Sequence, residues 1–300
     1  MGFLSPHPPS PVSLLRKRFG ELGWVAGKTY RVEFAYAGGK LDRLPALADM
    51  LVAKKVDVIW TLGPEAAVAA ARATTTIPIV FALVGFPVES GLVDSLAKPG
   101  RNVTGVAWSS SPGIDAKRIQ LLREIAPDAL RLASLSVPSL VDTVSGDRIS
   151  AISRDAFDAA SRDQGFELRR FKVLEDADLE PAFAAIVKWG AQALQDTGSP
   201  LSYRNMKRIV DFTNRNRLPA IFTFPDYVKA GGLMSYAVDW RPIVVRSYGY
   251  VDKILRGAKP AELPVDLPKT YKLAVNLKTA KALGLTIPPS LLLQADKVIE

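Results

Sequence analysis

The stretch "TLGPEAAVAAARATTTIPIVFALVGFPVESGLV" at residues 61–93 decides the fold. It contains two short apolar runs, and each run leads into a turn with glycine and proline, at 62–64 and 84–87. Between them, "PEAAVAAARA" at 64–73 is typical of a helix with proline in its first turn, where the missing N–H removes no hydrogen bond. A strand, a helix and a second strand in this order indicate a βαβ unit of a parallel sheet.

The same alternation of strand and helix patterns extends along the whole chain. In the first half, the pattern predicts strands at 2–5, 30–37, 56–61, 77–83 and 103–106, and helices at 12–22, 44–51, 64–73 and 90–97. In the second half, it predicts strands at 132–137, 166–173, 191–195, 220–224 and 231–237, and helices at 114–125, 147–164, 179–189 and 202–214. This duplication predicts an α/β fold with two doubly wound parallel-sheet lobes.

The residues after 238 indicate how the chain returns to each lobe. An isolated helix is predicted at 243–255, and a further strand–helix unit begins at Tyr271. We therefore predict three crossovers between the lobes and closure about this hinge when a ligand binds. The first lobe is predicted to hold 1–108 and 239–268, the second 109–238 and 269–300, with the ligand cleft between them.

Length, charge and cysteine content exclude several classes of protein. A chain of 300 residues exceeds one typical core, which agrees with two lobes. The net charge of +9 comes from scattered residues, with the densest cluster only three long at 16–18, so we expect a solvated basic surface and no nucleic acid partner. The absence of cysteine excludes disulfides, thiol catalysis and thiolate metal sites. No apolar run approaches the length of a membrane span.

Catalytic and cofactor motifs are missing. The single histidine, His7, lies in a proline-rich loop, and no His or Cys cluster has the spacing of a metal site. No GxSxG elbow, Walker A loop or GxGxxG fingerprint occurs. We therefore expect no metal, no cofactor and no enzymatic activity.

Candidate ligand-binding residues follow the predicted strands, because ligands of open parallel sheets bind beyond the carboxyl ends of the strands. Hydroxyl groups and the N–H groups near 63–65 could hold a carboxylate, aromatic rings could pack on a ring-bearing ligand, and Asp196 or Asp226 could pair with an ammonium group. The alternative is that these are ordinary βα turns and core aromatics. The predicted site residues are Ser5, Pro6, His7, Gly63, Pro64, Glu65, Gly85, Phe86, Trp108, Ser109, Pro138, Ser139, Asp196, Thr197, Phe224, Asp226 and Tyr236.

Four long blocks carry a resemblance to a known family. They are "TIPIVFALVGFPVESGLVDSLAKPGRNVTGV" (76–106), "AGGLMSY" (230–236), "YVDKILRGAKPAELPV" (250–265) and "NLKTAKALGLTIPPSLLLQADKVIE" (276–300). In this order they resemble the ABC-transporter substrate-binding proteins that include tryptophan- and tyrosine-binding members. The resemblance implies a type I periplasmic-binding-protein fold, a small-molecule ligand and a membrane permease as partner. It also implies a monomer in the periplasm with a signal peptide, which "MGFLSPHPPSPV" does not show.

Two departures from the family pattern concern the ligand. The family usually has "GDPV" where this chain has Gly85-Phe86-Pro87-Val88, so an acidic residue is replaced by an aromatic one. The segment "QALQDTGSPL" at 192–201 is also atypical, because the family is usually more apolar there. The loss of an acidic partner favours an apolar, aromatic or acyl ligand group near Phe86.

Two other functions share this architecture. The effector-binding core of a transcription regulator would require an N-terminal helix-turn-helix, and this chain starts directly at a strand. A two-lobed α/β transferase would require an identifiable base or metal site, and none is found. An extracytoplasmic receptor that captures a small aromatic or carboxylate-bearing solute, possibly an amino acid, is therefore the favoured interpretation.

Overall fold

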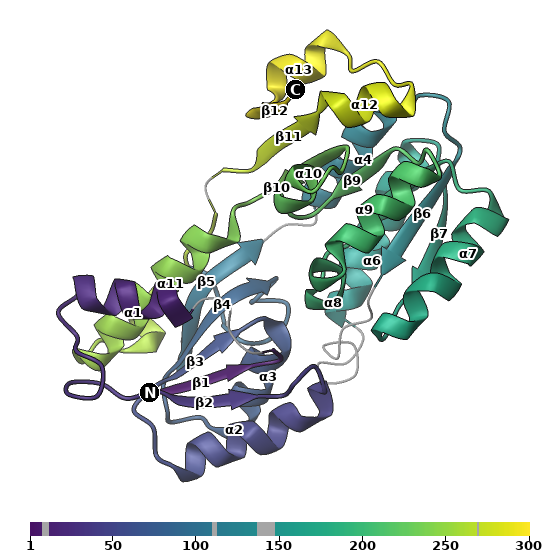
Figure 1. Cartoon of the computed structure of the whole chain (residues 1–300). Coiled ribbons are helices and arrows are strands. Elements are labelled where there is room, and N and C mark those ends of the chain that lie inside the picture. The colour runs from purple at the N-terminus through teal and green to yellow at the C-terminus, as the bar shows by residue number, and fades with distance from the viewer. Residues whose placement is uncertain (8–11, 110–112, 137–147, 269) are drawn as a thin grey trace. The chain divides into compact units, whose positions relative to one another are not determined.

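The computed structural model describes residues 1–7, 12–109, 113–136, 148–268 and 270–300 (Figure 1). Contacts between Cα atoms divide the chain into two compact units. Unit 1 is built mainly from 1–109 and 240–268, and unit 2 mainly from 113–136, 151–239 and 270–300.

Unit 1 contains a five-stranded sheet in the order β2-β1-β3-β4-β5, and all of its strand pairs are parallel. Parallel strands buried on both faces are expected to be apolar, and β4 fits this description, whereas the mostly buried β5 also contains Thr104 and Ser109. The strands are β1 (Gly2–Ser5), β2 (Glu33–Tyr36), β3 (Ile59–Leu62), β4 (Ile79–Gly85) and β5 (Val103–Ser109).

Helices cover both faces of the unit 1 sheet (Figure 1). One face packs on α2 (Leu44–Ala53) and α3 (Pro64–Ala73), and the other on α1 (Val12–Glu21) and α11 (Trp240–Leu255). The buried indole Nε1 of Trp60 donates to Ser247 Oγ at 2.8 Å, which joins β3 to α11. Two 3₁₀ turns are η1 (Leu41–Arg43) and η3 (Pro260–Glu262).

Unit 2 contains a seven-stranded sheet in the order β12-β11-β10-β9-β8-β6-β7. The β10–β11 pair is antiparallel, so the second sheet is mixed at this one pairing and parallel at the others. The strands are β6 (Arg131–Ser136), β7 (Glu167–Lys172), β8 (Ala193–Asp196), β9 (Ala220–Phe222), β10 (Met234–Ala237), β11 (Lys272–Asn276) and β12 (Lys297–Ile299).

The unit 2 sheet is also covered on both faces. One core forms against α4 (Gly113–Ile125), α6 (Arg148–Asp163), α12 (Leu277–Leu283) and α13 (Pro289–Gln294). The other forms against α7 (Leu179–Trp189), α8 (Pro200–Arg204), α9 (Met206–Arg215) and α10 (Asp226–Lys229), and η2 (Asp176–Asp178) precedes α7. Adjacent residues on a strand point to opposite faces of the sheet and therefore pack in different cores. This alternation determines which residues face α4.

Two predicted elements differ from the structure. The helix predicted at 90–97 is wrong, since this segment forms turns in which the backbone N–H of Asp94 donates to Pro99 O at 2.9 Å. Gly91 there has a φ of 69°, which interrupts a helix. The helix predicted at 202–214 is divided into α8 and α9 at Asn205.

Within the part of the chain that the structure describes, no helix combines the length and apolar character that crossing a bilayer requires.

Candidate functional site

The carboxyl ends of β1, β3, β4 and β5 lie at one edge of the unit 1 sheet, because these strands are parallel neighbours. Hydrogen bonds join the turns that follow them. The N–H of Gly63 donates to Ala82 O at 3.0 Å, and the N–H of Phe86 donates to Ser109 O at 3.0 Å. This edge therefore brings together the predicted residues after β3, β4 and β5.

The turn after β1 places three predicted residues at the same edge. Ser5 and Pro6 are buried and His7 is partly buried. The N–H of His7 lies 3.4 Å from Ser5 Oγ, and Pro6 O accepts from the N–H of Gly39 at 2.8 Å. The histidine ring lies over Gly39, where an added Cβ would come 3.2 Å from His7 Cε1. These contacts connect the ends of β1 and β2.

Backbone strain is concentrated at the end of β4. Leu83 has a φ of 62° and Phe86 a φ of 51°, so two bulky residues adopt a left-handed conformation within four positions. A left-handed residue other than glycine costs about 1–2 kcal/mol and is retained where the surroundings enforce it. The half-buried Phe86 ring belongs to this turn.

The α3 N-terminus begins at Gly63, which has a φ of 87° that favours glycine. Pro64 occupies the first turn, as predicted from its sequence. A Cβ added at Gly63 would lie 3.5 Å from Glu65 Oε2, so the Glu65 carboxylate lies close to this turn. The N–H groups at this helix start thus have an acidic side chain beside them.

Trp108 and Ser109 end β5, with Trp108 partly buried and Ser109 almost fully buried. Residues 110–112, which follow Ser109, lie outside the described part of the chain. Pro138 and Ser139, predicted after β6, also lie outside the described residues.

In unit 2, the turns after β8 and β9 carry four of the predicted residues. Thr197 is exposed, and Phe224 and Asp226 are partly buried. Asp226 Oδ2 accepts from Tyr203 Oη at 3.1 Å, and Asp226 Oδ1 accepts from Lys229 Nζ at 2.9 Å. The rings of Tyr203 and Phe224 meet edge to face, with centroids 5.1 Å apart.

Asp196, the fourth of these residues, ends β8 with 1% of its surface exposed. Burial raises the pKa of its carboxyl to about 6, and the Gly198 N–H and the hydroxyls of Tyr227 and Ser202 oppose this shift. These groups lie close to it, yet neither carboxylate oxygen makes a hydrogen bond of ordinary geometry. The side chain is buried near Tyr227 of α10 and Ser202 of α8.

A second aromatic pair lies at the end of β10. The Tyr236 ring stacks on Tyr271, with centroids 5.8 Å apart and an interplanar angle of 23°. Tyr236 is partly buried, and burial raises its phenol pKa. Two aromatic pairs therefore flank the carboxyl ends of β9 and β10.

Three residues that the sequence did not single out meet on the face of the sheet covered by α4. Arg118 donates from Nε to Tyr236 O at 2.9 Å and from Nη1 to Asp115 Oδ1 at 2.8 Å. Gln195 Nε2 donates to the same Asp115 oxygen at 3.2 Å. We call Asp115, Arg118 and Gln195 the α4 polar cluster. The i,i+3 spacing of Asp115 and Arg118, and a glutamine inside an apolar strand, were the available signals.

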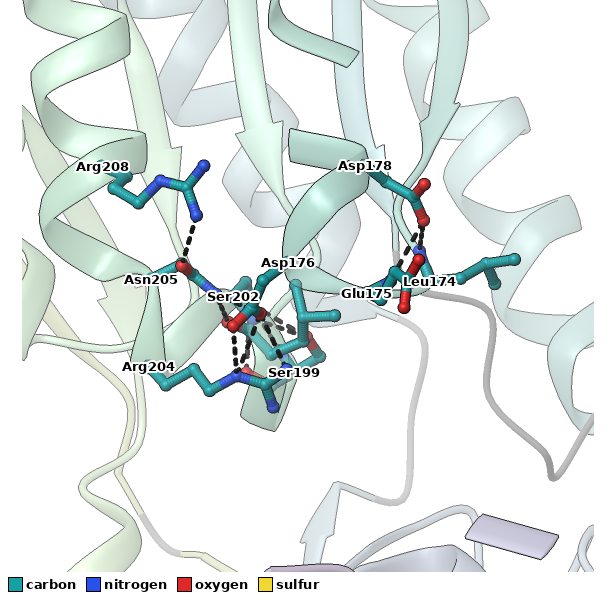
Figure 2. A network of polar contacts seen from close by, with 10 residues as sticks. Leu174, Glu175, Asp176, Asp178, Ser199, Ser202, Arg204, Asn205 and Arg208 are labelled. Carbon is teal, nitrogen blue, oxygen red and sulfur yellow. Dashed lines mark hydrogen bonds and ion pairs between the residues drawn. The ribbon is translucent and has the colours of Figure 1, made fainter. Parts of the chain in front are cut away.

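The loops after β7 and β8 are fastened to each other by a polar network, which Figure 2 shows. Asp176 accepts from Arg204 Nη2 at 2.8 Å, from Arg204 Nε at 3.1 Å and from Asn205 Nδ2 at 2.8 Å. These bonds hold the pKa of Asp176 below its usual range, with Arg204 contributing most. Ser199 and Ser202 cap the start of α8 reciprocally. The network fixes the loops at this edge of the unit 2 sheet.

Among the described residues, no group of three or more His, Cys, Asp or Glu side chains could hold a metal ion. The site chemistry at both sheet edges is that of hydroxyls, amides, aromatic rings and single charges.

Comparisons with known proteins give a consistent result. The model of a family described as ABC transporter substrate binding protein matches residues 12–299. A tyrosine-binding protein of Clostridioides difficile (strain R20291) is 25% identical over 269 residues, which cover 90% of this chain and 75% of that protein.

Two solved structures extend the comparison to the fold. The ABC domain of Streptococcus pneumoniae in complex with L-Trp is 25% identical, with a TM-score of 0.83 and coverage of 99% of both chains. A conserved domain protein from Vibrio cholerae is 25% identical, with a TM-score of 0.85 and coverage of 99% of this chain and 98% of that one.

Proposed function

Because the chain belongs to the ABC transporter substrate-binding protein family, we propose that its ligand is an aromatic amino acid or a closely related ring-bearing carboxylate. The family membership makes the chain a solute-binding protein of an ABC transporter, with binding and not turnover as its activity. The regulator and transferase alternatives therefore fall away. What remains to be proposed is the ligand and the residues that hold it.

The observation that carries this proposal is the pair of aromatic contacts at the carboxyl edge of the unit 2 sheet. Tyr203 with Phe224, and Tyr236 with Tyr271, present partly buried rings beside the ends of β9 and β10. Aromatic rings in offset or edge-to-face arrangements bind another ring with favourable energy beyond area burial. The tyrosine-binding relative and the L-Trp complex support the same ligand class.

In unit 1, we propose that the residues around Phe86 add to recognition. Phe86 and Trp108 are partly buried rings at the ends of β4 and β5, suited to an apolar ligand body. The hydroxyls of Ser5 and Ser109, which the sequence also predicts as ligand contacts, lie at this edge. Gly63, Pro64, Glu65 and Gly85 contribute the backbone of the turns.

The proposal also covers the partner that receives the ligand and the compartment in which the protein acts. We propose that the loaded protein delivers its ligand to a membrane permease outside the cytoplasmic membrane, in the periplasm, as a monomer. Family membership supports the transporter context, in which binding proteins are typically extracytoplasmic.

A thermal-shift screen tests the ligand class. The aromatic set contains L-tryptophan, L-tyrosine, L-phenylalanine and the ring-bearing carboxylate indole-3-propionate, with L-lysine, L-glutamate and ribose as controls. Ligand at about 100 times its Kd should raise the unfolding free energy by about 2.7 kcal/mol, which is readily detected. A shift with at least one aromatic amino acid and none with the controls supports the proposal. A shift with ribose alone, or with no member of the aromatic set, contradicts it.

A further inference from the structure

The α4 polar cluster has unused hydrogen-bonding capacity in a buried place. Arg118 is 2% exposed, and its Nη2 has no hydrogen-bond partner. Gln195 is fully buried, and its Oε1 has no partner either. A buried donor or acceptor without a partner is destabilising by about 1–3 kcal/mol, so folded proteins rarely retain one without a reason.

The orphaned atoms belong to groups that converge on one point. Arg118 Nη1 and Gln195 Nε2 both donate to Asp115 Oδ1. The orphaned Nη2 therefore belongs to a guanidinium group, and the orphaned Oε1 to an amide group, that is already hydrogen-bonded to Asp115. The Asp115 side chain is 28% exposed, whereas that of Arg118 is 3% exposed. The cluster is therefore open to solvent at Asp115, whereas Arg118 Nη2 and Gln195 Oε1 are shielded from solvent, so a ligand group reaches these two atoms only when the groups that cover them move aside.

The chemistry of the cluster is complementary to a zwitterion. A free guanidinium N–H attracts a carboxylate, while a free amide oxygen and an adjacent aspartate attract an ammonium group. Arg118 and Asp115 carry opposite charges, and the buried carboxyl of Asp196, on which Arg118 also acts, adds a second acidic group nearby. A neutral or singly charged ligand would satisfy only part of the set.

The cluster is hydrogen-bonded to the backbone of a tyrosine whose ring belongs to an aromatic pair. Arg118 Nε donates to the backbone oxygen of Tyr236, whose ring stacks on Tyr271. Charged groups and ring contacts for one small molecule thus lie next to each other at the carboxyl edge of unit 2. We infer that the α4 polar cluster binds the α-ammonium and α-carboxylate groups of an aromatic amino acid, an inference that rests on the proposed function.

The roles divide between the two orphaned atoms. Arg118 Nη2 donates to the ligand carboxylate, and Gln195 Oε1, with Asp115, accepts from the ligand ammonium. This assignment places the acidic partner of the ligand ammonium on α4.

The test combines protein variants with ligands that lack one charged group. Calorimetry measures binding of L-tryptophan, of tryptamine, which lacks the carboxylate, and of indole-3-propionate, which lacks the ammonium. The variants are Gln195→Met, which keeps the length of the native side chain, and Arg118→Met, which keeps its unbranched apolar stem and removes the guanidinium. Arg123→Met is the matched control, because Arg123 is on the same helix and donates to Gln164 O and Ala129 O, away from the cluster.

The expected result is selective. Arg118→Met weakens L-tryptophan and indole-3-propionate by roughly 10- to 100-fold, the worth of a hydrogen bond to a charged group, and leaves tryptamine within about twofold. Gln195→Met weakens L-tryptophan and tryptamine by roughly tenfold and leaves indole-3-propionate unchanged. Arg123→Met leaves the ranking of the three ligands as in the parent.

Other outcomes overturn the inference. Equal weakening of all three ligands would mean that the cluster only supports the fold, with an internal water on the orphaned atoms. Unchanged affinities would mean that the ligand binds elsewhere, and the proposed function would survive. If the parent protein binds none of the three ligands, and neither L-tyrosine nor its matching analogues, both this inference and the proposed function are wrong. If Arg118→Met fails to fold, Gln195→Met decides alone.

Discussion

Phe86 occupies a left-handed backbone position, with a φ of 51°, in the turn after β4. Replacing it by alanine would remove the ring and keep a Cβ-bearing residue at this φ, as in the parent. Phe86→Gly removes the ring while the backbone adopts the same conformation freely. We expect Phe86→Gly to weaken an aromatic ligand several-fold, since ring contacts contribute about 0.5–1.5 kcal/mol beyond buried area.

A charge introduced at the same position separates ring contact from turn geometry. Phe86→Asp places a carboxylate in this turn, and should shift preference toward ligands with an amino group. Calorimetry with L-tryptophan and indole-3-propionate measures both variants. If each variant returned the parent affinity and ranking, Phe86 would not be in the site.

Asp196 is predicted to make the stability of the fold depend on pH. Its pKa is about 6 in the folded protein against 3.8 ordinarily, so the unfolded chain releases this proton first as pH rises. The stability that the raised pKa of Asp196 contributes is fully present below pH 3.8 and is lost as pH rises to about 6. Above this pH, the ionised and buried carboxylate lowers the free energy of unfolding by about 3 kcal/mol. Asp196→Asn should abolish this decline and increase stability at pH 7.

Urea titrations of the parent and of Asp196→Asn at several pH values between 4 and 7 measure this difference. The difference between the two proteins should grow with pH across this window, which isolates Asp196 from the other carboxylates. Parallel curves for the two proteins would show that Asp196 titrates normally.

At the scale of elements, two glycines with opposite surroundings test the packing of unit 1. Gly105 on β5 pairs with Phe81 on β4, and an added Cβ would lie 2.2 Å from Phe81 O. Gly249 lies inside α11, where an added Cβ meets nothing within 4 Å.

Alanine at these two glycines should change stability in opposite directions. Gly105→Ala should destabilise by about 1–3 kcal/mol or more, because the strands must separate. Gly249→Ala should stabilise the protein by about 0.4–1 kcal/mol, because alanine lowers the backbone entropy of the unfolded chain. Denaturant midpoints measure both changes, and a stabilising Gly105→Ala would contradict the described strand pairing.

The network in Figure 2 is expected to stabilise the loops after β7 and β8. Asp176→Asn should destabilise by about 0.5–1 kcal/mol at pH 7, because Arg204 loses an ionised acceptor. Because Arg204 lowers the Asp176 pKa, this contribution is present above the ordinary pKa and lost as pH falls below it.

Asp211→Asn is the matched control for the Figure 2 network. It removes an exposed i,i+4 pair with Lys207 on α9 and should change the free energy of unfolding by less than about 0.5 kcal/mol. An effect of Asp176→Asn that is no larger than the control would show that the network does not contribute.

Elements with strong periodicity could be predicted from the sequence, and the pairings between distant segments could not. The strand at 103–106 and the helix at 64–73 follow from apolar runs and a well-placed proline. The segment 90–97 has apolar residues at helical spacing, yet Gly91 and the bond from Asp94 to Pro99 favour turns. Local pattern cannot weigh such specific turn contacts.

The candidate site could be predicted to the level of strand ends. The turns at Gly63 and Phe86 were found because glycine and proline follow buried strands. The α4 polar cluster was missed because Asp115 and Gln195 are 80 positions apart and meet only after the sheet forms. The complete burial of Asp196 was missed for a related reason, since the residues of α8 and α10 that lie near it come from later in the chain.

For the whole molecule, the family match over 12–299 spans residues of both units. Each unit has its own buried cores on the two faces of its sheet. The lobe boundaries predicted at 108, 238 and 268 stay a prediction, and a structure with a single chain crossing would contradict them.

Isothermal titration calorimetry of the full chain with L-tryptophan and L-tyrosine, with the ligand then recovered and identified by mass spectrometry, tests the central claim most directly. We predict saturable one-to-one binding of at least one of these amino acids, which is recovered chemically unchanged. Absence of binding by both amino acids, or recovery of a converted product, would contradict the account of this chain as a receptor for an aromatic amino acid.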